Sequence, residues 1–370
     1  MENTVKQAFV DWLGEACNAR VVDTKMIQPL WSGYGACFRA ELDYSTPLIS
    51  KKGPRLNSQT DVAHMHDDAL STKSITHVVV KIASPPDRLA HPKGWNGQQS
   101  DKRKRHSFRV ENHFYSEVQP LTTEKCRTAT CITHDRKGEA TLLVMEDLAH
   151  NGYTHTAQSL TVASAKTVLK WLAHFHARFL NKVHITDSNL WQEGTYWHLS
   201  TREDEYHAMP DSLLKQHAGA ISNRLSSARY QTLVHGDAKV ANFCFTENFS
   251  SCAAVDFQYV GYGVGVKDVA YFLGSALTTK EQQEHRQTLL GTYFAELETA
   301  LRDRMSEKAH QCDLTGNDIE QIIAEWKDLY CFACADFNRF LVGWSPDHWK
   351  IEEELQYQTD VALARLGDSG

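Results

Sequence analysis

The chain has 370 residues, of which 42% are hydrophobic and 23% are charged, as in an ordinary soluble globular protein. Its 39 basic and 46 acidic residues give a net charge of −7, which argues against a general nucleic-acid binder. No apolar run approaches the roughly 20 residues that cross a bilayer, and the first residues lack the apolar core of a signal peptide. We therefore predict a cytoplasmic protein that does not contact membranes.

The first half of the chain is predicted to be rich in short strands. Apolar residues recur at helical spacing near the N-terminus, and β-branched runs bounded by glycine and polar turns follow. In chain order we expect a surface helix over 5–16, a hairpin of strands 25–31 and 37–42, a polar insertion over 44–76, a strand over 77–82, a loop over 84–104, a helix through 108–118, and strands over 128–133 and 140–145.

After residue 147 the pattern changes to long amphipathic helices. Strands first and helices afterwards predict an α+β fold with two lobes, residues 1–147 and 148–370. Two moderate cores are also what a chain of this length favours. In the second lobe we expect helices over 159–180, 210–228, 279–306 and 315–342, interrupted by one hairpin that pairs 243–245 with 253–256.

The most informative motif is His-Gly-Asp-Ala-Lys-Val-Ala-Asn over 235–242, followed by Val-Asp-Phe-Gln over 255–258. An Asp and an Asn five residues apart, with a second Asp on the next strand, hold metal-bound ATP against a hydroxyl in kinases. We predict that Asp237 is the catalytic base or orients the acceptor hydroxyl, and that Asn242 and Asp256 ligate magnesium. A turn aspartate would explain Asp237 alone, but not its combination with the other two residues.

Two further residues of this loop have different expected roles. Lys239 could reach the γ-phosphate and stabilise developing charge, although a solvated surface lysine explains it almost equally well. His235 is expected to pack the loop and fix its backbone rather than to take part in the chemistry. His174 and His176, which cannot share a helix face, are both expected to be structural.

Lys81 lies within an apolar strand, where an unpaired charge would be costly, so it needs an anionic partner. ATP phosphates and a helix glutamate would serve. Glu111 is the first choice and Glu117 the alternative, because spacing alone does not decide which of them faces inward. The turn Gly33-x-Gly35 could let backbone amides approach the phosphates, although it lacks a third glycine.

Segments on either side of the motif supply the remaining candidate contacts. Met145, Glu146 and Leu148 would link the two lobes and offer backbone groups to adenine. The acceptor would lie between the hairpin loop and the late helices. Aromatic walls would suit a sterol-like acceptor and acidic ones an amine, so the sequence leaves the acceptor open. The candidates, each of which could equally be core or surface, are Trp197, Tyr206, Trp344, Trp349, Glu203, Asp204 and Glu205.

The H-G-D-x-x-x-x-N and D-F-Q motifs, with Glu-Asp-Leu over 146–148 upstream, resemble the aminoglycoside phosphotransferase and choline kinase superfamily, and within it the ecdysteroid kinase-like branch. The resemblance extends from the glycine turn to about Trp344. It implies a protein-kinase-like fold, with residues 1–147 as the nucleotide-binding lobe and 148–370 as the catalytic and substrate-binding lobe. It also implies a nucleotide clamp of Lys81 and Glu111, a base at Asp237, metal ligands at Asn242 and Asp256, and a loop brace at Asp268.

We therefore predict an enzyme that uses ATP and magnesium to phosphorylate a hydroxyl of a small molecule of the sterol-like, amino alcohol or aminoglycoside class. A protein Ser/Thr kinase is the first alternative, since Lys239 matches many protein kinases, whereas members of the superfamily often have an aromatic residue or His there. Gly236 in place of arginine and the lack of an Ala-Pro-Glu segment after Asp256 argue against it. A catalytically idle nucleotide-binding scaffold is the second alternative, which the presence of Lys81, Asp237 and Asp256 disfavours.

Overall fold

The computed structural model describes residues 4–30, 33–45, 75–85, 98–180, 189–306 and 314–367. The chain divides into two compact units: unit 1 comprises Met1–Asn96 and Cys131–Asp147, and unit 2 comprises Gly97–Thr130 and Leu148–Gly370. The last residue of unit 1 is Asp147, which is the expected lobe boundary. The earlier segment Gly97–Thr130 belongs to unit 2. The functional division into lobes 1–147 and 148–370 stays a prediction.

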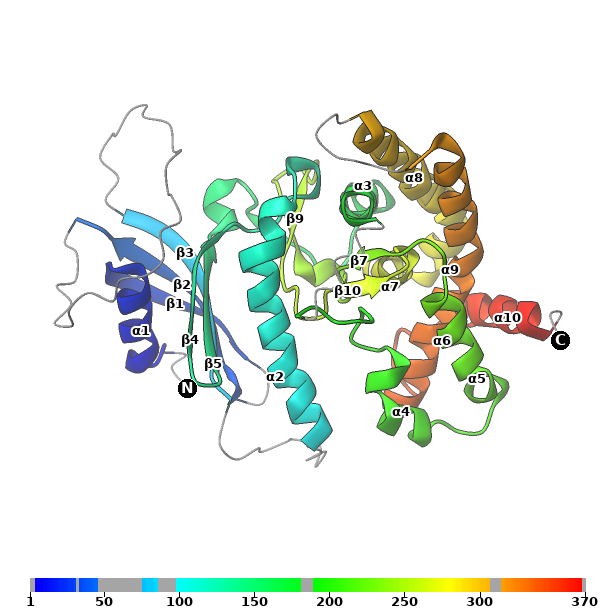
Figure 1. Cartoon of the computed structure of the whole chain (residues 1–370), viewed down its shortest axis with the longest axis horizontal. Coiled ribbons are helices and arrows are strands. Elements are labelled where there is room, and N and C mark those ends of the chain that lie inside the picture. The colour runs from blue at the N-terminus through cyan, green and yellow to red at the C-terminus, as the bar shows by residue number, and fades with distance from the viewer. Residues whose placement is uncertain are drawn as a thin grey trace. The chain divides into compact units, whose positions relative to one another are not determined.

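In its described residues, unit 1 is a five-stranded antiparallel sheet with one helix packed against it (Figure 1). The strand order is β1-β2-β3-β5-β4. The apolar face of α1 and alternate strand residues share one core, in which Leu13 of the helix joins Phe38 and Val80 of the sheet. The Trp12 indole also donates to Asp135 at 2.6 Å. The elements are α1 (Gln7–Cys17), β1 (Arg20–Leu30), β2 (Gly35–Asp43), β3 (Ile75–Ala83), β4 (Cys131–Lys137) and β5 (Ala140–Glu146).

Unit 2 is mainly helical. Helix α8 packs against α3, and Figure 1 shows α10 beside α9. Two small sheets, β10-β7 and β6-β8-β9, lie among the helices and carry the motif loops. The elements are α2 (Gln98–His113), a π-helical turn (Phe114–Val118), β6 (His155–Thr156), α3 (Val162–Phe179), α4 (Glu203–Ala208), α5 (Leu213–Gln216), α6 (Ala218–Ser226), β7 (Thr232–Val234), β8 (Phe243–Phe245), β9 (Cys252–Ala254), β10 (Gly261–Gly263), α7 (Val266–Ala276), α8 (Thr279–Ser306), α9 (Gly316–Trp344) and α10 (Glu353–Gly367), with short 3-10 turns at Gln119–Leu121, Glu124–Cys126, Leu148–Asn151, Leu199–Thr201 and Val240–Asn242.

The predicted fold class is confirmed, since a β-rich unit and a helical unit make up an α+β protein. The N-terminal helix, the β1–β2 hairpin, β3 and the three long helices α3, α8 and α9 lie where the sequence predicts them. Most of the predicted insertion over 44–76 lies outside the described residues. Within the described part of the chain, no helix combines the length and apolarity needed to cross a membrane.

Four local predictions are wrong. The expected loop over 84–104 ends earlier, because α2 already begins at Gln98. Strand β4 is displaced toward the turn and runs over Cys131–Lys137, so Asp135 lies in the strand. The single helix expected over 210–228 is two helices, α5 and α6, joined at His217. The small hairpin is not alone among the helices either, since β7 and β10 form a second antiparallel pair.

Candidate active site

A short loop joins β7 to β8 and carries the predicted catalytic residues. All of β7 is buried and pairs with β10, so burial and strand pairing fix the start of the loop. Gly236 has a φ of 80°, and a Cβ there would lie 2.0 Å from the backbone oxygen of Tyr259. A 3-10 turn over Val240–Asn242 then leads into β8. The loop therefore approaches a neighbouring backbone so closely that only glycine fits at 236.

Gly236→Ala is expected to destabilise the protein by more than about 2 kcal/mol, because the left-handed conformation and the clash with Tyr259 both disfavour a side chain. The measurement is urea unfolding of purified wild type and variant. Gly219→Ala is the matched control: Gly219 lies in α6 with nothing within 4 Å of an added Cβ, so alanine should cost nothing there. Equal stabilities of the two variants would contradict the strain at Gly236.

Asp268, at the start of α7, holds the backbone of this loop. Its Oδ2 accepts the His235 amide at 2.6 Å and its Oδ1 accepts the Gly236 amide at 3.0 Å. The Asp268 side chain is fully buried, and the same Oδ2 lies 3.1 Å from Nε2 of His176. A buried carboxylate with three donors is well satisfied. This contact pattern is the one expected of the loop brace that the family resemblance implied.

Two histidines connect the loop to its surroundings. His176 on α3 contacts the Tyr293 hydroxyl through Nδ1 at 2.8 Å, so a buried chain runs from α8 through α3 to Asp268. His235 lies 3.0 Å from the Val255 carbonyl through Nε2, and its Nδ1 lies 3.3 Å from the Asp237 amide. Both side chains hold backbone and neighbouring residues, in agreement with their predicted structural roles.

Asp237 lies at the centre of a small polar cluster. Its Oδ2 accepts from Nζ of Lys239 at 3.0 Å and from Nδ2 of Asn242 at 3.1 Å. The Asn242 amide nitrogen also donates to the Asp237 carbonyl at 2.8 Å. Asp237 is 7% exposed, and no described residue lies in hydrogen-bond geometry with its Oδ1, although the Tyr271 hydroxyl is close enough to interact with the carboxylate. One oxygen of a largely buried carboxylate is therefore held by the loop, and the other is left for a further donor.

Electrostatic interactions tie neighbouring side chains to this carboxylate. Burial alone would lower the pKa of Lys239, but the negative charges of Asp237 and Asp256 raise it above its usual value. Burial raises the pKa of Tyr271 strongly, and Tyr196 and Asp237 raise it further. The Tyr196 hydroxyl donates to that of Tyr271 at 3.3 Å. Lys239 therefore carries its positive charge beside Asp237, while the two tyrosines stay protonated.

Asp256 follows β9 and has a φ of 70°, which is uncommon for a residue with a side chain. The Val255 amide donates to the Asn242 carbonyl at 2.9 Å, so the two predicted metal ligands lie on adjoining backbone segments. The next residue, Phe257, stacks on Phe114 with ring centroids 3.8 Å apart. Buried aromatic packing thus anchors the chain directly after Asp256.

The candidates for nucleotide contacts in unit 1 lie on neighbouring strands, except Gly33, which precedes β2. Lys81 lies near the C-terminal end of β3 and is paired in register with Cys37 and Leu143. A Cβ on Gly35 would lie 1.9 Å from the Ile82 carbonyl oxygen, so close strand packing by itself explains this glycine, whereas Gly33 faces open space. The remaining two, Met145 and Glu146, end β5.

Three of the nucleotide-contact candidates belong to unit 2. Glu111 on α2 is buried at 3% exposure, whereas Glu117 in the π-helical turn is exposed. Leu148 is buried at the start of a 3-10 turn. Of the two glutamates, Glu111 is the one whose burial fits a paired role. Lys81 and Glu111 belong to different units, and their pairing stays a prediction.

The residues expected near the acceptor have different environments. Trp197 is fully buried in an aromatic cluster with Tyr271 and Phe337, so it is a core residue. Trp344 is 39% exposed and Trp349 63% exposed. Among the acidic candidates, Glu205 is buried and pairs with Arg202 at 2.8 Å, while Glu203 and Asp204 are exposed on α4; Tyr206 lies on the same helix.

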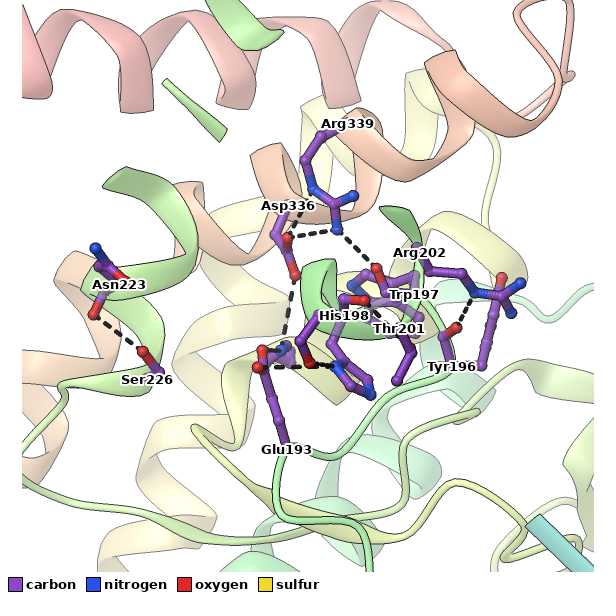
Figure 2. Close-up of polar contacts among 12 residues, drawn as sticks. Glu193, Tyr196, Trp197, His198, Thr201, Arg202, Asn223, Ser226, Asp336 and Arg339 are labelled. Atoms are coloured by element: carbon purple, nitrogen blue, oxygen red, sulfur yellow. Dashed lines mark hydrogen bonds and ion pairs between the residues drawn. The ribbon is translucent and has the colours of Figure 1, made fainter. Parts of the chain in front are cut away.

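A buried ionic network supports the segment that carries Tyr196 and Trp197 (Figure 2). Arg339 on α9 donates to the Trp197 carbonyl at 2.6 Å and to Asp336 at 2.9 Å. Lys267 lies 3.7 Å from the other oxygen of Asp336. Burial alone would raise the pKa of Asp336, but the positive charges of Arg339 and Lys267 lower it. The network keeps its charges and fixes this segment against α9.

Some contacts of the motif were not predicted. Gln258 accepts from Nζ of Lys104 at 2.7 Å, so the basic start of α2 is tied to the motif. Lys350, between α9 and α10, is close enough to Asp237 for the two charges to interact. Both lysines are far from their partners in the sequence, so residue spacing along the chain could not have identified these contacts.

The sequence was compared with known families and proteins. Residues 91–206 and 194–305 match the profile of the ecdysteroid kinase-like family, and together they cover more than half of the chain. No curated protein matches the chain.

Three of the solved structures that resemble the chain are kinases. Amicoumacin kinase hAmiN in complex with AMP-PNP, Ca²⁺ and Ami has 11% identity, with 98% of this chain and 93% of that chain covered and a TM-score of 0.44. A microcompartment-associated aminopropanol kinase has 12% identity, coverage of 97% and 94%, and a TM-score of 0.45. The choline kinase LicA from Streptococcus pneumoniae has 10% identity, coverage of 98% and 98%, and a TM-score of 0.43. Similarity at this level is distant.

Proposed function

The chain belongs to the ecdysteroid kinase-like family, and from this premise we propose that it is an ATP- and magnesium-dependent phosphotransferase whose acceptor is a hydroxyl group of a small molecule. The family indicates a kinase-like phosphotransferase acting on small molecules. The dependence on ATP and magnesium, the working residues and the acceptor classes, namely sterol-like compounds, amino alcohols and aminoglycosides, belong to the proposal.

The observation that carries the proposal is the arrangement around Asp237. One carboxylate oxygen is held by Lys239 at 3.0 Å and Asn242 at 3.1 Å, and no described residue lies in hydrogen-bond geometry with the other. Asp268 holds the backbone on the N-terminal side of Asp237. A carboxylate held in this way can accept a hydrogen bond from an acceptor hydroxyl, orient it and take its proton.

The donor set fits magnesium. Both amide hydrogen bonds of Asn242 run from its nitrogen to Asp237, which assigns the amide orientation and leaves its oxygen for a cation. Asp256 supplies a carboxylate on the adjoining segment. Among the described residues, no group of three or more His, Cys, Asp and Glu side chains forms a metal site by itself. Two oxygen donors suit magnesium, which takes its remaining ligands from phosphates and water.

When bound, magnesium ATP supplies the transferable phosphoryl group and neutralises its charge. The other assigned residues act on position and charge. Lys239 carries a positive charge beside Asp237 and would stabilise negative charge that develops on the phosphoryl oxygens. Lys81 and Glu111 would clamp the nucleotide, Gly33 and Gly35 would offer it backbone amides, and Met145, Glu146 and Leu148 would contact adenine.

The first test is nucleotide binding. ATP with magnesium should raise the melting temperature of the wild type by several degrees, since a ligand at 100 times its Kd stabilises by about 2.7 kcal/mol. Asp256→Ala should lose most of this shift because it removes the anionic metal ligand. Asp303→Ala is the control, as Asp303 lies on α8 in an exposed pair with Lys125. Equal shifts in wild type and Asp256→Ala would remove Asp256 from the metal site.

The second test is turnover. A coupled assay of ADP release should detect activity with one class among sterols, amino alcohols, aminoglycosides and sugars. Release of ADP in the presence of such a compound would support the proposal. If ATP binds but none of these compounds releases ADP above background, the scaffold alternative is favoured. Phosphorylation of Ser or Thr in a protein substrate at a higher rate than any small molecule would favour the protein kinase.

A further inference from the structure

Lys350 lies among three aromatic rings. Its Nζ is 4.4 Å from the ring centroid of Tyr271, 5.4 Å from that of Trp349 and 5.8 Å from that of Phe337. Ammonium groups are attracted to aromatic faces within about 6 Å, and sets of such rings bind ammonium ligands in other proteins. We call Tyr271, Phe337 and Trp349 the aromatic box. In this chain, the ammonium group in the aromatic box belongs to the protein's own Lys350 side chain.

No described residue forms an ion pair or a side-chain hydrogen bond with the Lys350 ammonium, which lies over the three rings. Burial lowers the pKa of Lys350 to about 8, while the charge of Asp237 opposes that effect and the charge of Lys239 adds to it. Lys350 is therefore close enough to the proposed reacting carboxylate to interact with it. A cation this close to Asp237 affects the charge that an acceptor can carry there.

The box is part of a rigid framework. Tyr271 and Phe337 are buried in the aromatic cluster with Trp197, and the Tyr271 hydroxyl accepts from Tyr196 at 3.3 Å. The ionic network of Figure 2 fixes the segment that carries Tyr196. The third ring, Trp349, is 63% exposed, so the box is open on the Trp349 side. Two walls are thus set by the core, and Lys350 enters from the connection between α9 and α10.

We propose that Lys350 is a specificity-determining residue that occupies the aromatic box with its own ammonium and so excludes acceptor alcohols that carry a cationic group. Without Lys350, the box beside Asp237 would accept an ammonium group of a substrate. With Lys350 in place, a second cation would meet like charge and find the rings already covered. The acceptor is therefore an alcohol without a positive charge near its reacting hydroxyl, which narrows the three proposed classes to sterol-like compounds and disfavours amino alcohols and aminoglycosides. The assignment of the aromatic box to the acceptor site rests on the proposed phosphotransferase function.

The test measures the affinity of the full chain for tetramethylammonium by isothermal titration calorimetry. Lys350→Ala removes a volume close to that of this ion and leaves the three rings in place. The variant should bind tetramethylammonium at least about tenfold more tightly than the wild type, in line with cation–π attraction at a partly desolvated site. Lys350→Arg keeps a cation in the box and should bind the ion as weakly as the wild type.

Two further variants serve as controls. Lys327→Ala removes a lysine that lies 5.3 Å from the Phe294 ring elsewhere in unit 2, and it should not change the affinity. Trp349→Ala in the Lys350→Ala background removes the exposed wall and should reverse the gain. Equal affinity in wild type and Lys350→Ala, or tight binding by Lys350→Arg, would overturn the proposal. Because the measurement involves no phosphoryl transfer, a failure of the proposed function would show only in the turnover assays.

Discussion

Asp237→Asn is expected to lower turnover by about a hundredfold or more while ATP binding stays nearly unchanged. The amide keeps the shape of the carboxylate, and its oxygen can still accept from Lys239 or Asn242, which donate to Oδ2 at 3.0 and 3.1 Å. It cannot take a proton from the acceptor hydroxyl, and it no longer provides the negative charge that faces Lys239. The measurement compares kcat from ADP release with ATP affinity from thermal shifts.

Asp328→Asn is the matched control for this substitution. Asp328 on α9 is 43% exposed and pairs with Arg224 at 3.1 Å on the surface, so the same change of carboxylate to amide should leave turnover unaffected. Near-normal turnover of Asp237→Asn would remove Asp237 from the role of base. A parallel loss of ATP binding and turnover would instead indicate that the substitution disrupts the whole loop.

Asp268→Ala is expected to destabilise the protein by at least about 3 kcal/mol and to abolish most of the activity. The substitution leaves the His235 amide, the Gly236 amide and His176 without their buried acceptor, and each buried unsatisfied donor costs about 1–3 kcal/mol. For a unit of this size, the loss corresponds to a fall of the melting temperature by about 6 °C or more. Calorimetric thermal unfolding measures it directly.

Asp303→Ala again provides the control, because its exposed pair with Lys125 should contribute less than about 1 kcal/mol. Asp268→Asn retains one acceptor oxygen in the same shape, so it should lose less stability than Asp268→Ala. A melting temperature of Asp268→Ala within 2 °C of the wild type, on the order of the shift that 1 kcal/mol produces, would contradict the bracing role.

Much of the fold could be predicted from local pattern. The long amphipathic repeats gave α3, α8 and α9, and the β-branched run over 77–82 predicted β3, because burial of one face determines such elements. The errors occur where the pattern is weak or where packing overrides it. The polar sequence Gln98–Lys104 looks like a loop, but it forms the first turns of α2, where Lys104 is tied to Gln258.

In the candidate site, too, some features could be predicted from the sequence and others could not. Asp237, Lys239 and Asn242 are neighbours in the chain, so their spacing alone predicts that they lie together, and Asp256 follows across a short hairpin. Trp197 shows the limit of such reasoning: as an aromatic residue it could line the acceptor site or fill the core, and it is fully buried in the core. Composition does not distinguish these environments, because both favour large apolar rings.

By itself the sequence predicted the class of chemistry, since an Asp, an Asn and a second Asp at close spacing would need no long-range folding to form the proposed metal and hydroxyl site. The tertiary structure alone decided which distant groups hold and surround that site. Asp268 and His176 are 92 residues apart and share a hydrogen bond. Lys350, in the connection between α9 and α10, lies against Tyr271 of α7. The reason is physical: the partners of a buried charge are selected by packing between elements, which the spacing of residues along the chain does not encode.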